Sequence, residues 1–299
     1  MDGDRPAGQA ATPPTEAMGE VVVTLTCPDR IGIVGAVAGF LAERGVNMLE
    51  CQQYSDLQTG RFFMRVQGEA PPGVGAERLS AELAPLADEL EMTYGVYDGT
   101  ERPRILILVS KLGHCLNDLL YRHRIGALRA EIVGVVSNHP DFADLVGSYG
   151  IPFHHLPVTP DTKASQEARL LELVDETGTD LVVLARYMQI LSEDTTARLS
   201  GRAINIHHSF LPSFKGARPY HQAYARGVKL VGSTAHYVTS DLDEGPIIEQ
   251  ETARVDHTYP PERLVAMGRD IECLVLARAV TWHLEHRVFV NGNKTVVFR

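Results

Sequence analysis

Three polar residues in the second half of the chain have side chains suited to attack on a carbonyl group. Asn205 and His207 flank Ile206 at the end of a short apolar run, and Asp243 stands in an Asp-Glu-Gly-Pro turn. An amide and a protonated imidazole stabilise an oxyanion, and a carboxylate orients or deprotonates a nucleophile. Judged by spacing alone, a structural role is equally well supported: Asn205 would cap a turn, and the ring of His207 would form its hydrogen bonds within a loop.

The elements that must position these residues alternate between strand and helix patterns. The strand patterns are Ile105–Val109, Glu131–Ser137, Asp180–Ala185, Ala203–Ile206, Val231–Val238 and Ile247–Val255. The helical patterns are Ala164–Glu176 and Pro260–His286. Such alternation predicts an α/β fold with a doubly wound, mostly parallel sheet. Ligands bind beyond the carboxyl ends of such strands, which here are Val109, Ala185 and Ile206.

The front of the chain predicts a second, smaller α/β domain. Strand patterns cover Glu20–Thr26, Val46–Tyr54, Arg61–Gln67 and Glu91–Tyr97. One helix follows Asp29, taken as its N-cap, and ends at Arg44-Gly45; another covers Ala76–Asp88, where Pro85 introduces a kink or an early end. The order βαββαβ predicts a ferredoxin-like open sheet with helices on one face. We assign residues 18–98 to this domain, 99–103 to a linker and 104–299 to the larger domain.

Composition narrows the partners. The net charge of −10 argues against nucleic acid, whose binders carry a basic face. The four cysteines are scattered, as in a reduced cytoplasmic protein, and no apolar run approaches the roughly 20 residues that span a membrane. Residues 1–17 lack the pattern of a signal peptide and are expected to be a disordered tail.

Several further polar residues have two readings. The twelve histidines include two adjacent pairs, His154-His155 and His207-His208, and no metal-ligand spacing, so we expect no metal. His208 either lines the site or lies in a surface loop. His236 either faces the site or packs in the core. Lys111 and His114 contact a substrate tail or, more simply, solvent, and for Cys115 a structural role is favoured.

The second half resembles the folate-dependent formyltransferase family. The signature Asn-x-His-x-Ser-x-Leu-Pro and a downstream Asp-x-Gly turn are matched by these residues: Asn205, His207, Ser209, Leu211, Pro212, Ser213, Gly216, Gly232, His236, Asp243 and Gly245. The resemblance implies that Asn205, His207 and Asp243 are catalytic. It also implies that Met188, Gln189, Ile190 and Leu191 bind the folate, and that His236 and Gly245 contact the substrate.

The acceptor of the formyl group is inferred by elimination. Transferases that act on a glycinamide nucleotide carry a glycine-rich phosphate loop after the first strand, whereas Ser110–Cys115 contains a single glycine. A transferase acting on tRNA needs a basic surface and an additional C-terminal nucleic-acid-binding domain; this chain is acidic and ends soon after the catalytic fold. Water is left as the acceptor.

The front domain resembles an ACT domain, through Asp29–Val34 and Val46–Leu49. ACT domains bind amino acids and pair with one another, which implies a homo-oligomer and an effector near Asp29, Gly32 and Asn47. A domain that only holds subunits together is the alternative.

An ACT domain before a formyltransferase-type domain implies hydrolysis of 10-formyltetrahydrofolate to tetrahydrofolate and formate, without a cofactor. That reaction balances one-carbon folate pools and supplies formate for purine synthesis. Transfer to an amine, or a non-catalytic folate or amino-acid sensor, are the alternatives.

Overall fold

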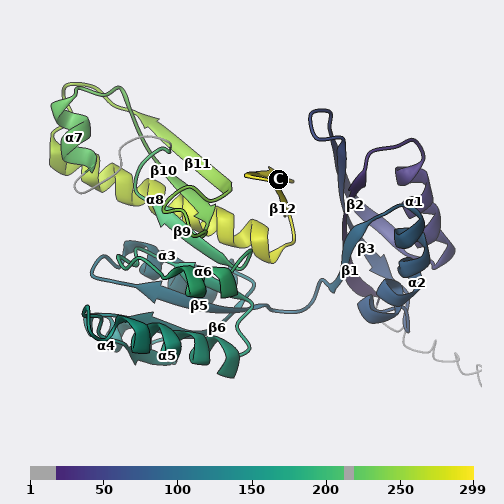
Figure 1. Ribbon diagram of the computed structural model, residues 1–299, viewed down its shortest axis with the longest axis horizontal. Coiled ribbons are helices and arrows are strands. Elements are labelled where there is room, and N and C mark those ends of the chain that lie inside the picture. Colours follow the sequence, from purple (N-terminus) through teal and green to yellow (C-terminus); the bar gives the residue numbers. More distant parts are fainter. Residues whose placement is uncertain (1–17, 212–218) are drawn as a thin grey trace, which may run out of the picture. The chain divides into compact units, whose positions relative to one another are not determined.

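The chain folds into two compact units. The computed structural model describes residues 18–211 and 219–299. The first unit ends at Thr100 and the second runs Glu101–Arg299 (Figure 1). The predicted tail, residues 1–17, lies outside the described residues, as do Pro212, Ser213 and Gly216 of the motif. Among the described helices, none has both the length and the hydropathy to cross a membrane.

The first unit is a four-stranded antiparallel sheet in the order β2-β3-β1-β4, with both helices on one face (Figure 1). Its elements are β1 Gly19–Pro28, α1 Ile33–Glu43, β2 Asn47–Asp56, β3 Arg61–Ala70, α2 Ala76–Glu89 and β4 Thr93–Asp98. The predicted order βαββαβ is confirmed. Alternate residues of β1, such as Val23 and Leu25, pack with Val37 of α1 and Leu83 of α2 in one core.

Helix α1 begins later than predicted, so the assignment of Asp29 as its N-cap is wrong. The N-cap is Gly32, whose φ of 100° lies in the left-handed region that glycine tolerates. Asp29 instead donates its backbone N–H to the Gly60 carbonyl, which continues the pairing of β1 with β3. The left-handed glycine predicted after the helix is present as Gly45, and α2 continues through Pro85 to Glu89.

The described part of the second unit has a seven-stranded sheet in the order β11-β10-β9-β8-β5-β6-β7, and a separate hairpin of β12 and β13. Its strands are β5 Arg104–Val109, β6 Glu131–Ser137, β7 Phe153–His155, β8 Leu181–Leu184, β9 Ala203–His207, β10 Leu230–Tyr237, β11 Ile247–Arg254, β12 Val288–Asn291 and β13 Lys294–Val297. Its helices are α3 His114–Arg124, α4 Ala143–Gly147, α5 Lys163–Glu176, α6 Glu193–Arg198, α7 Pro219–Ala225 and α8 Pro261–Leu284. The five neighbouring strands β9, β8, β5, β6 and β7 are parallel to one another. Strand β10 pairs antiparallel with β9 on one side and with β11 on the other. The mostly parallel, doubly wound sheet is confirmed.

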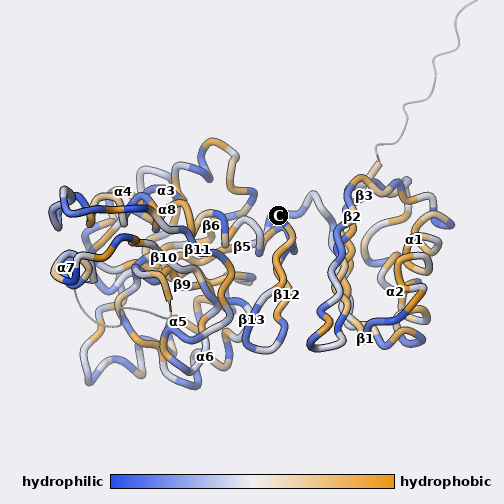
Figure 2. Tube along the Cα trace, turned by 90° about the horizontal axis from the view of Figure 1, so that it is seen from above, coloured by the Kyte–Doolittle hydropathy of each residue, from blue (hydrophilic) through white to orange (hydrophobic). Residues whose placement is uncertain are grey.

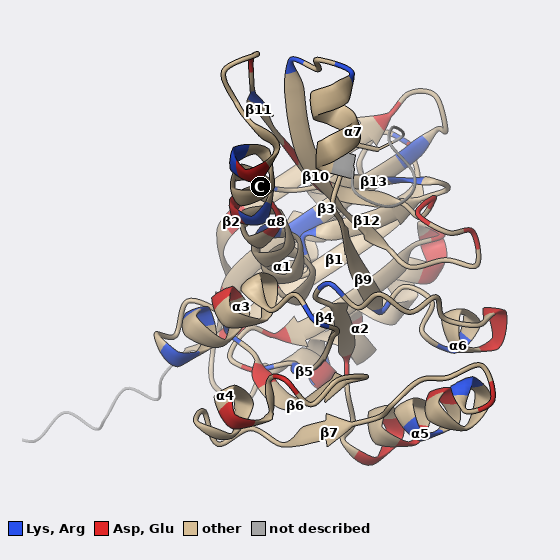
Figure 3. Cartoon of the chain, turned by 90° about the vertical axis from the view of Figure 1, so that its left-hand side faces the viewer, with Lys and Arg blue, Asp and Glu red and all other residues tan. Residues whose placement is uncertain are grey.

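Strand β5 lies at the centre of this sheet and is covered on both faces. Ile105, Ile107 and Val109 belong to one hydrophobic cluster, and the alternate residues Leu106 and Leu108 belong to the other. Hydrophobic residues run along the central strands in Figure 2, while charged residues gather on outer helices such as α4, α5 and α6 in Figure 3. The core therefore fixes the parallel strands so that their carboxyl ends meet at one edge.

The C-terminal part of α8 packs against β10 through a buried polar contact. The hydroxyl of Tyr237 forms a hydrogen bond of 2.7 Å with Nδ1 of His283. Burial, with a smaller effect of His286, lowers the pKa of His283 to about 4 from its ordinary value of 6.5. His283 is therefore neutral in the folded protein near neutral pH.

This lowered pKa predicts a loss of stability in mild acid. Because the unfolded chain binds the proton first, the contribution of His283 is fully present above pH 6.5 and is lost as the pH falls towards about 4. The difference in free energy of unfolding between wild type and His283→Gln should therefore shrink from pH 7 to pH 4. Urea unfolding followed by the fluorescence of Trp282, the single tryptophan, measures it. The exposed His257→Gln is the control, and a difference independent of pH would contradict the prediction.

Candidate active site

A cavity of about 640 Å³ opens in the second unit at the carboxyl ends of the parallel strands. Leu112 and His114 follow β5, Arg186 follows β8, and Asn205 and His207 end β9; all five line it. The place where ligands bind in such sheets is thus hollow, as the sequence predicts.

Asn205 and His207 lie on the same face of β9, and Ile206 between them packs in the core. Both pair with the antiparallel strand β10: Asn205 stands opposite His236, and His207 stands opposite Thr234. Alternation along the strand, together with this register, therefore brings Asn205, His207 and His236 to one wall of the cavity.

Asp243 reaches the same wall from the turn between β10 and β11. One carboxylate oxygen, Oδ1, lies 3.2 Å from Nδ1 of His207 and 3.7 Å from Nε2 of His236. The backbone of Asp243 has a φ of 58°, in the left-handed region that aspartate tolerates better than most residues. The turn also approaches β10 closely, because a Cβ at Gly245 would overlap the backbone oxygen of Tyr237. Gly245 does not itself line the cavity.

His236 is buried and orients the amide of Asn205. Its Nδ1 lies 2.8 Å from the carbonyl oxygen of Tyr237, and since a carbonyl only accepts, Nδ1 carries the proton. Nε2 of the same ring lies 3.2 Å from Nδ2 of Asn205 and 3.7 Å from Oδ1 of Asp243, so His236 holds the amide beside the carboxylate. Of the two earlier readings of His236, the one in which it faces the site is therefore supported.

His207 presents one ring nitrogen to the cavity. Nδ1 faces Asp243, while Nε2 is buried and has no hydrogen-bond partner among the described residues. The neighbouring His208 also lines the cavity and stacks on His207, with ring centroids 4.8 Å apart. A buried donor or acceptor without a partner is costly, so Nε2 is prepared to receive a polar atom of a ligand.

The charge on Asp243 is held by its neighbours. Burial alone raises the pKa of this carboxyl, but hydrogen bonds and charge interactions with His207 and His236 outweigh burial and bring the pKa well below the usual range. Asp243 is therefore ionised throughout the ordinary pH range.

The segment after β8 forms a second wall. Met188, Gln189, Ile190 and Leu191 all line the cavity, as the resemblance implies. Met188 donates its backbone N–H to Oγ of Ser110 at 2.9 Å, while its side chain is 58% exposed and that of Ile190 is 60% exposed. Exposed apolar side chains on a fixed backbone suit the binding of a flat aromatic ring.

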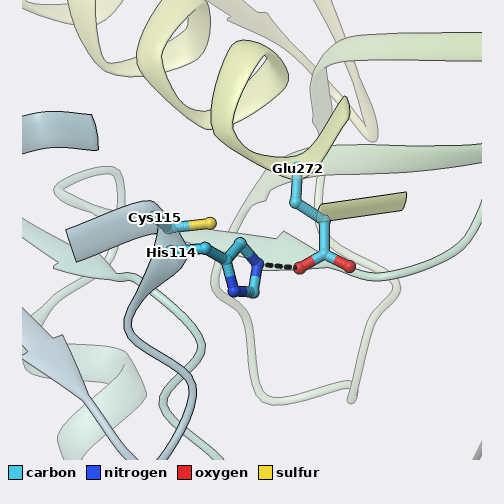
Figure 4. A group of neighbouring side chains, drawn as sticks. All are labelled: His114, Cys115 and Glu272. Atoms are coloured by element: carbon cyan, nitrogen blue, oxygen red, sulfur yellow. Dashed lines mark hydrogen bonds and ion pairs between the residues drawn. The ribbon is translucent and has the colours of Figure 1, made fainter. Parts of the chain in front are cut away.

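The third wall was not anticipated from the sequence. Nε2 of His114 lies 2.6 Å from Oε2 of Glu272, with Cys115 beside them (Figure 4). The expectation that His114 is solvent-exposed is wrong, because its side chain is only 16% exposed and lines the cavity. Lys111 is exposed. Glu272 stands in the apolar segment Ile271–Val280, and a single carboxylate there was the signal available.

The residues of this wall are linked by hydrogen bonds and ion pairs to Glu272. Glu272 is 2% exposed; Tyr220 donates its hydroxyl to Oε1 at 3.2 Å, and Nε of Arg186 lies 3.4 Å from Oε2. Burial raises the pKa of Glu272, but the opposing effects of His114 and Arg186 are larger together and bring the pKa below its ordinary value, so the carboxyl is ionised. His114, Cys115 and Glu272 offer ligand atoms within 4.8 Å of one another, yet the guanidinium of Arg186 disfavours a cation there. Burial and a hydrogen bond with Cys273 raise the pKa of Cys115, which is typical of an unreactive thiol.

Comparison with known proteins identifies both units. Residues 21–84 match the family model of the ACT domain, and residues 103–280 match that of formyl transferase. The formyltetrahydrofolate deformylase of Corynebacterium sp. (strain P-1) is 55% identical over 280 residues, 93% of this chain and 98% of that protein. The protein of the same name from Escherichia coli (strain K12) is 43% identical over 277 residues, 92% of this chain and 97% of that protein.

Solved structures agree. The crystal structure of formyltetrahydrofolate deformylase from Burkholderia mallei matches with a TM-score of 0.89 and 54% identity. The match covers 94% of this chain and 100% of that one. Glycinamide ribonucleotide transformylase 1 from Symbiobacterium toebii has a TM-score of 0.62 and 30% identity, covering 66% of this chain and 95% of that one. The chain therefore belongs to the formyltetrahydrofolate deformylase family, as an ACT domain followed by a formyl transferase domain.

Proposed function

We propose that this protein hydrolyses 10-formyltetrahydrofolate to tetrahydrofolate and formate, with Asn205, His207 and Asp243 as its catalytic residues. The observation that carries the proposal is the contact of 3.2 Å between Nδ1 of His207 and Oδ1 of Asp243, beside an Nε2 of His207 that has no hydrogen-bond partner among residues 18–211 and 219–299. The names of relatives that share most of the chain support the same substrate. Formate release would balance one-carbon folate pools and supply purine synthesis from the cytoplasm.

The geometry suggests a division of labour. A protonated His207 donates Nδ1–H to Asp243 and Nε2–H to the formyl oxygen, and the amide of Asn205 donates to the same oxygen. Asp243 accepts a hydrogen bond from the attacking water and orients it towards the formyl carbon. A carboxyl with so low a pKa is a weak base, so orientation and charge stabilisation are its first contributions.

Attack forms the bond between the water oxygen and the formyl carbon and places negative charge on the former carbonyl oxygen. The proton lost by water passes to the carboxylate of Asp243, because the protonated imidazole of His207 can accept no further proton. Collapse of this intermediate breaks the bond between carbon and the folate nitrogen, and that nitrogen takes a proton through His207 or a bound water. The products are tetrahydrofolate, formate and one proton, with no redox change and no cofactor.

Transfer to an amine is the alternative that the fold itself raises, because glycinamide ribonucleotide transformylases share the fold of the second unit. Two observations disfavour it. The segment Ser110–Cys115 has a single glycine where a phosphate would need a loop of free N–H groups. Glu272, a buried carboxylate on the cavity wall, is already bound by His114, Tyr220 and Arg186 and is not available to an ammonium group.

The first prediction tests Asp243. Asp243→Asn keeps the backbone conformation and a polar side chain but removes the charge that holds His207 and the water. Turnover should fall by about 10²–10⁴, the range for a positioned acid or base, while affinity for the folate changes little. Formate release and folate binding are measured separately, with Asp161→Asn, at an exposed aspartate outside the cavity, as control. A variant that retains near wild-type turnover would show that Asp243 is not catalytic.

The second prediction concerns the acceptor. Glycinamide ribonucleotide at saturating concentration should neither be formylated nor slow formate release, because no phosphate loop follows β5. The measurement follows formate and the formylated amine in parallel, with a glycinamide ribonucleotide transformylase as the positive control. Formylation at a rate that rivals formate release would favour the transferase.

Two features of the first unit support further proposals, one about an oligomer and one about an effector. Strand β2 is an edge of its sheet, and Met48, Leu49 and Tyr54 on it are exposed, as is Ile31 before α1. Exposed apolar edges are commonly covered by a partner, so we propose a homo-oligomer formed partly through this edge. The N-cap Gly32 leaves the N-terminus of α1 without a side-chain cap, and we propose that the carboxylate of an amino acid binds there, beside Asp29. Asn47 lies at the other end of the same sheet, level with Glu20, so it would join this site only from a second copy of the chain.

The third prediction tests this effector. Titration with each common amino acid should change formate release or thermal stability for at least one of them. Linkage limits the coupling to roughly 1–3 kcal/mol, or about 5- to 150-fold in affinity. Asn47→Ala should abolish the response and spare the basal rate, with the exposed Glu77→Ala on α2 as control. If no amino acid has any effect, the first unit is a scaffold only.

A further inference from the structure

Arg186 is an unusual residue for the wall of this cavity. Its backbone has a φ of 66°, which costs free energy for any side chain but glycine, and its side chain is 10% exposed. Of the four non-glycine residues described with positive φ, only Arg186 and Asp243 line the cavity. Retention of a strained, nearly buried arginine at this position indicates that its guanidinium has a use there.

The hydrogen-bonding capacity of Arg186 is not filled by the protein. A guanidinium has five N–H donors, and Glu272 is the one carboxylate near it, with 3.4 Å between Nε and Oε2. Nε is buried and makes no hydrogen bond in the described part of the chain. Glu272 is itself shared with His114 and Tyr220, so it cannot satisfy the arginine alone.

The surroundings of Arg186 favour an anion. The charged and titratable groups around Arg186 and on the cavity side of α8 are Glu272, His114, Cys115, Tyr220, His208 and Arg269, of which only Glu272 is negative near neutral pH. Glu272 fixes the guanidinium from one side, and the remaining donors are left for the cavity. Planar, paired N–H donors match the two oxygens of a carboxylate, the geometry in which arginine binds best.

The proposed reaction makes such a carboxylate inside this cavity. Formate leaves the formyl site beside Asp243, whose negative charge repels it. We propose that Arg186, held by Glu272, is a carboxylate-binding site that receives the formate released by hydrolysis. The proposal rests on the proposed function, and it assigns to Arg186 a role in product binding, separate from that of Asn205, His207 and Asp243.

Direct binding of formate tests the site without turnover. Thermal shift and ¹³C-formate NMR titrations with sodium formate are compared with sodium chloride at equal ionic strength. Wild type should bind formate, and Arg186→Gln should weaken binding about 10- to 100-fold, as expected for the loss of hydrogen bonds to a charged group. Arg186→Gly suits the left-handed backbone and guards against misfolding. Arg278→Gln, whose arginine pairs with Glu251 on β11, is the control and should bind formate as wild type does.

Kinetics distinguish formate from the other carboxylate that enters the cavity, the glutamate tail of the folate. If Arg186 binds formate, formate inhibits wild type, the inhibition constant rises by the same factor in Arg186→Gln, and the KM changes little. If Arg186 binds the tail, the KM of Arg186→Gln rises only with substrates that carry glutamate, and formate inhibition is unchanged, which overturns the proposal. Absence of formate binding by folded wild type also overturns it. Formate binding without any formate release from the substrate would refute the proposed function and leave the site standing.

Discussion

The contact between His207 and Asp243 is the constraint on which the site depends. Its two partners come from different parts of the sheet, the end of β9 and the turn after β10, so 3.2 Å is reached only if β10 pairs with β9 in one register. A shift by one residue would turn His236 away from Asn205 and move the turn that carries Asp243. The antiparallel addition of β10 to an otherwise parallel sheet is therefore part of the active site.

Much of the fold follows from periodicity. The apolar run at Ile105–Val109 predicts a strand covered on both faces, and the structure places its alternate residues in two cores. The start of α1 was missed because Asp29 looks like a helix cap, whereas Gly32 adopts the left-handed conformation that begins the helix. The hairpin of β12 and β13 was not predicted, because two strands of four residues carry too little pattern.

The site was only partly accessible from the sequence. Asn205, His207 and Asp243 were found by their types and by a family resemblance, and alternation explains why the first two share a face. Glu272 and Arg186 were not found, because their contact joins α8 to the end of β8 across 86 positions of the chain. No local spacing encodes a pair of that kind. What the sequence did offer was a charged residue inside an apolar helix, which needs a partner when it is buried.

The left-handed backbone of Asp243 also bears on how its side chain can be studied by substitution. Alanine at this position would meet a conformational cost of roughly 1–2 kcal/mol that aspartate and asparagine tolerate better. An alanine scan would therefore report two losses together, the chemistry of the carboxylate and the ease with which the turn closes. Glycine at this position would report the loss of the carboxylate alone, because it adopts the left-handed conformation without strain and has no side chain. The same backbone that delivers the carboxylate to His207 thus narrows the set of residues with which this turn is compatible.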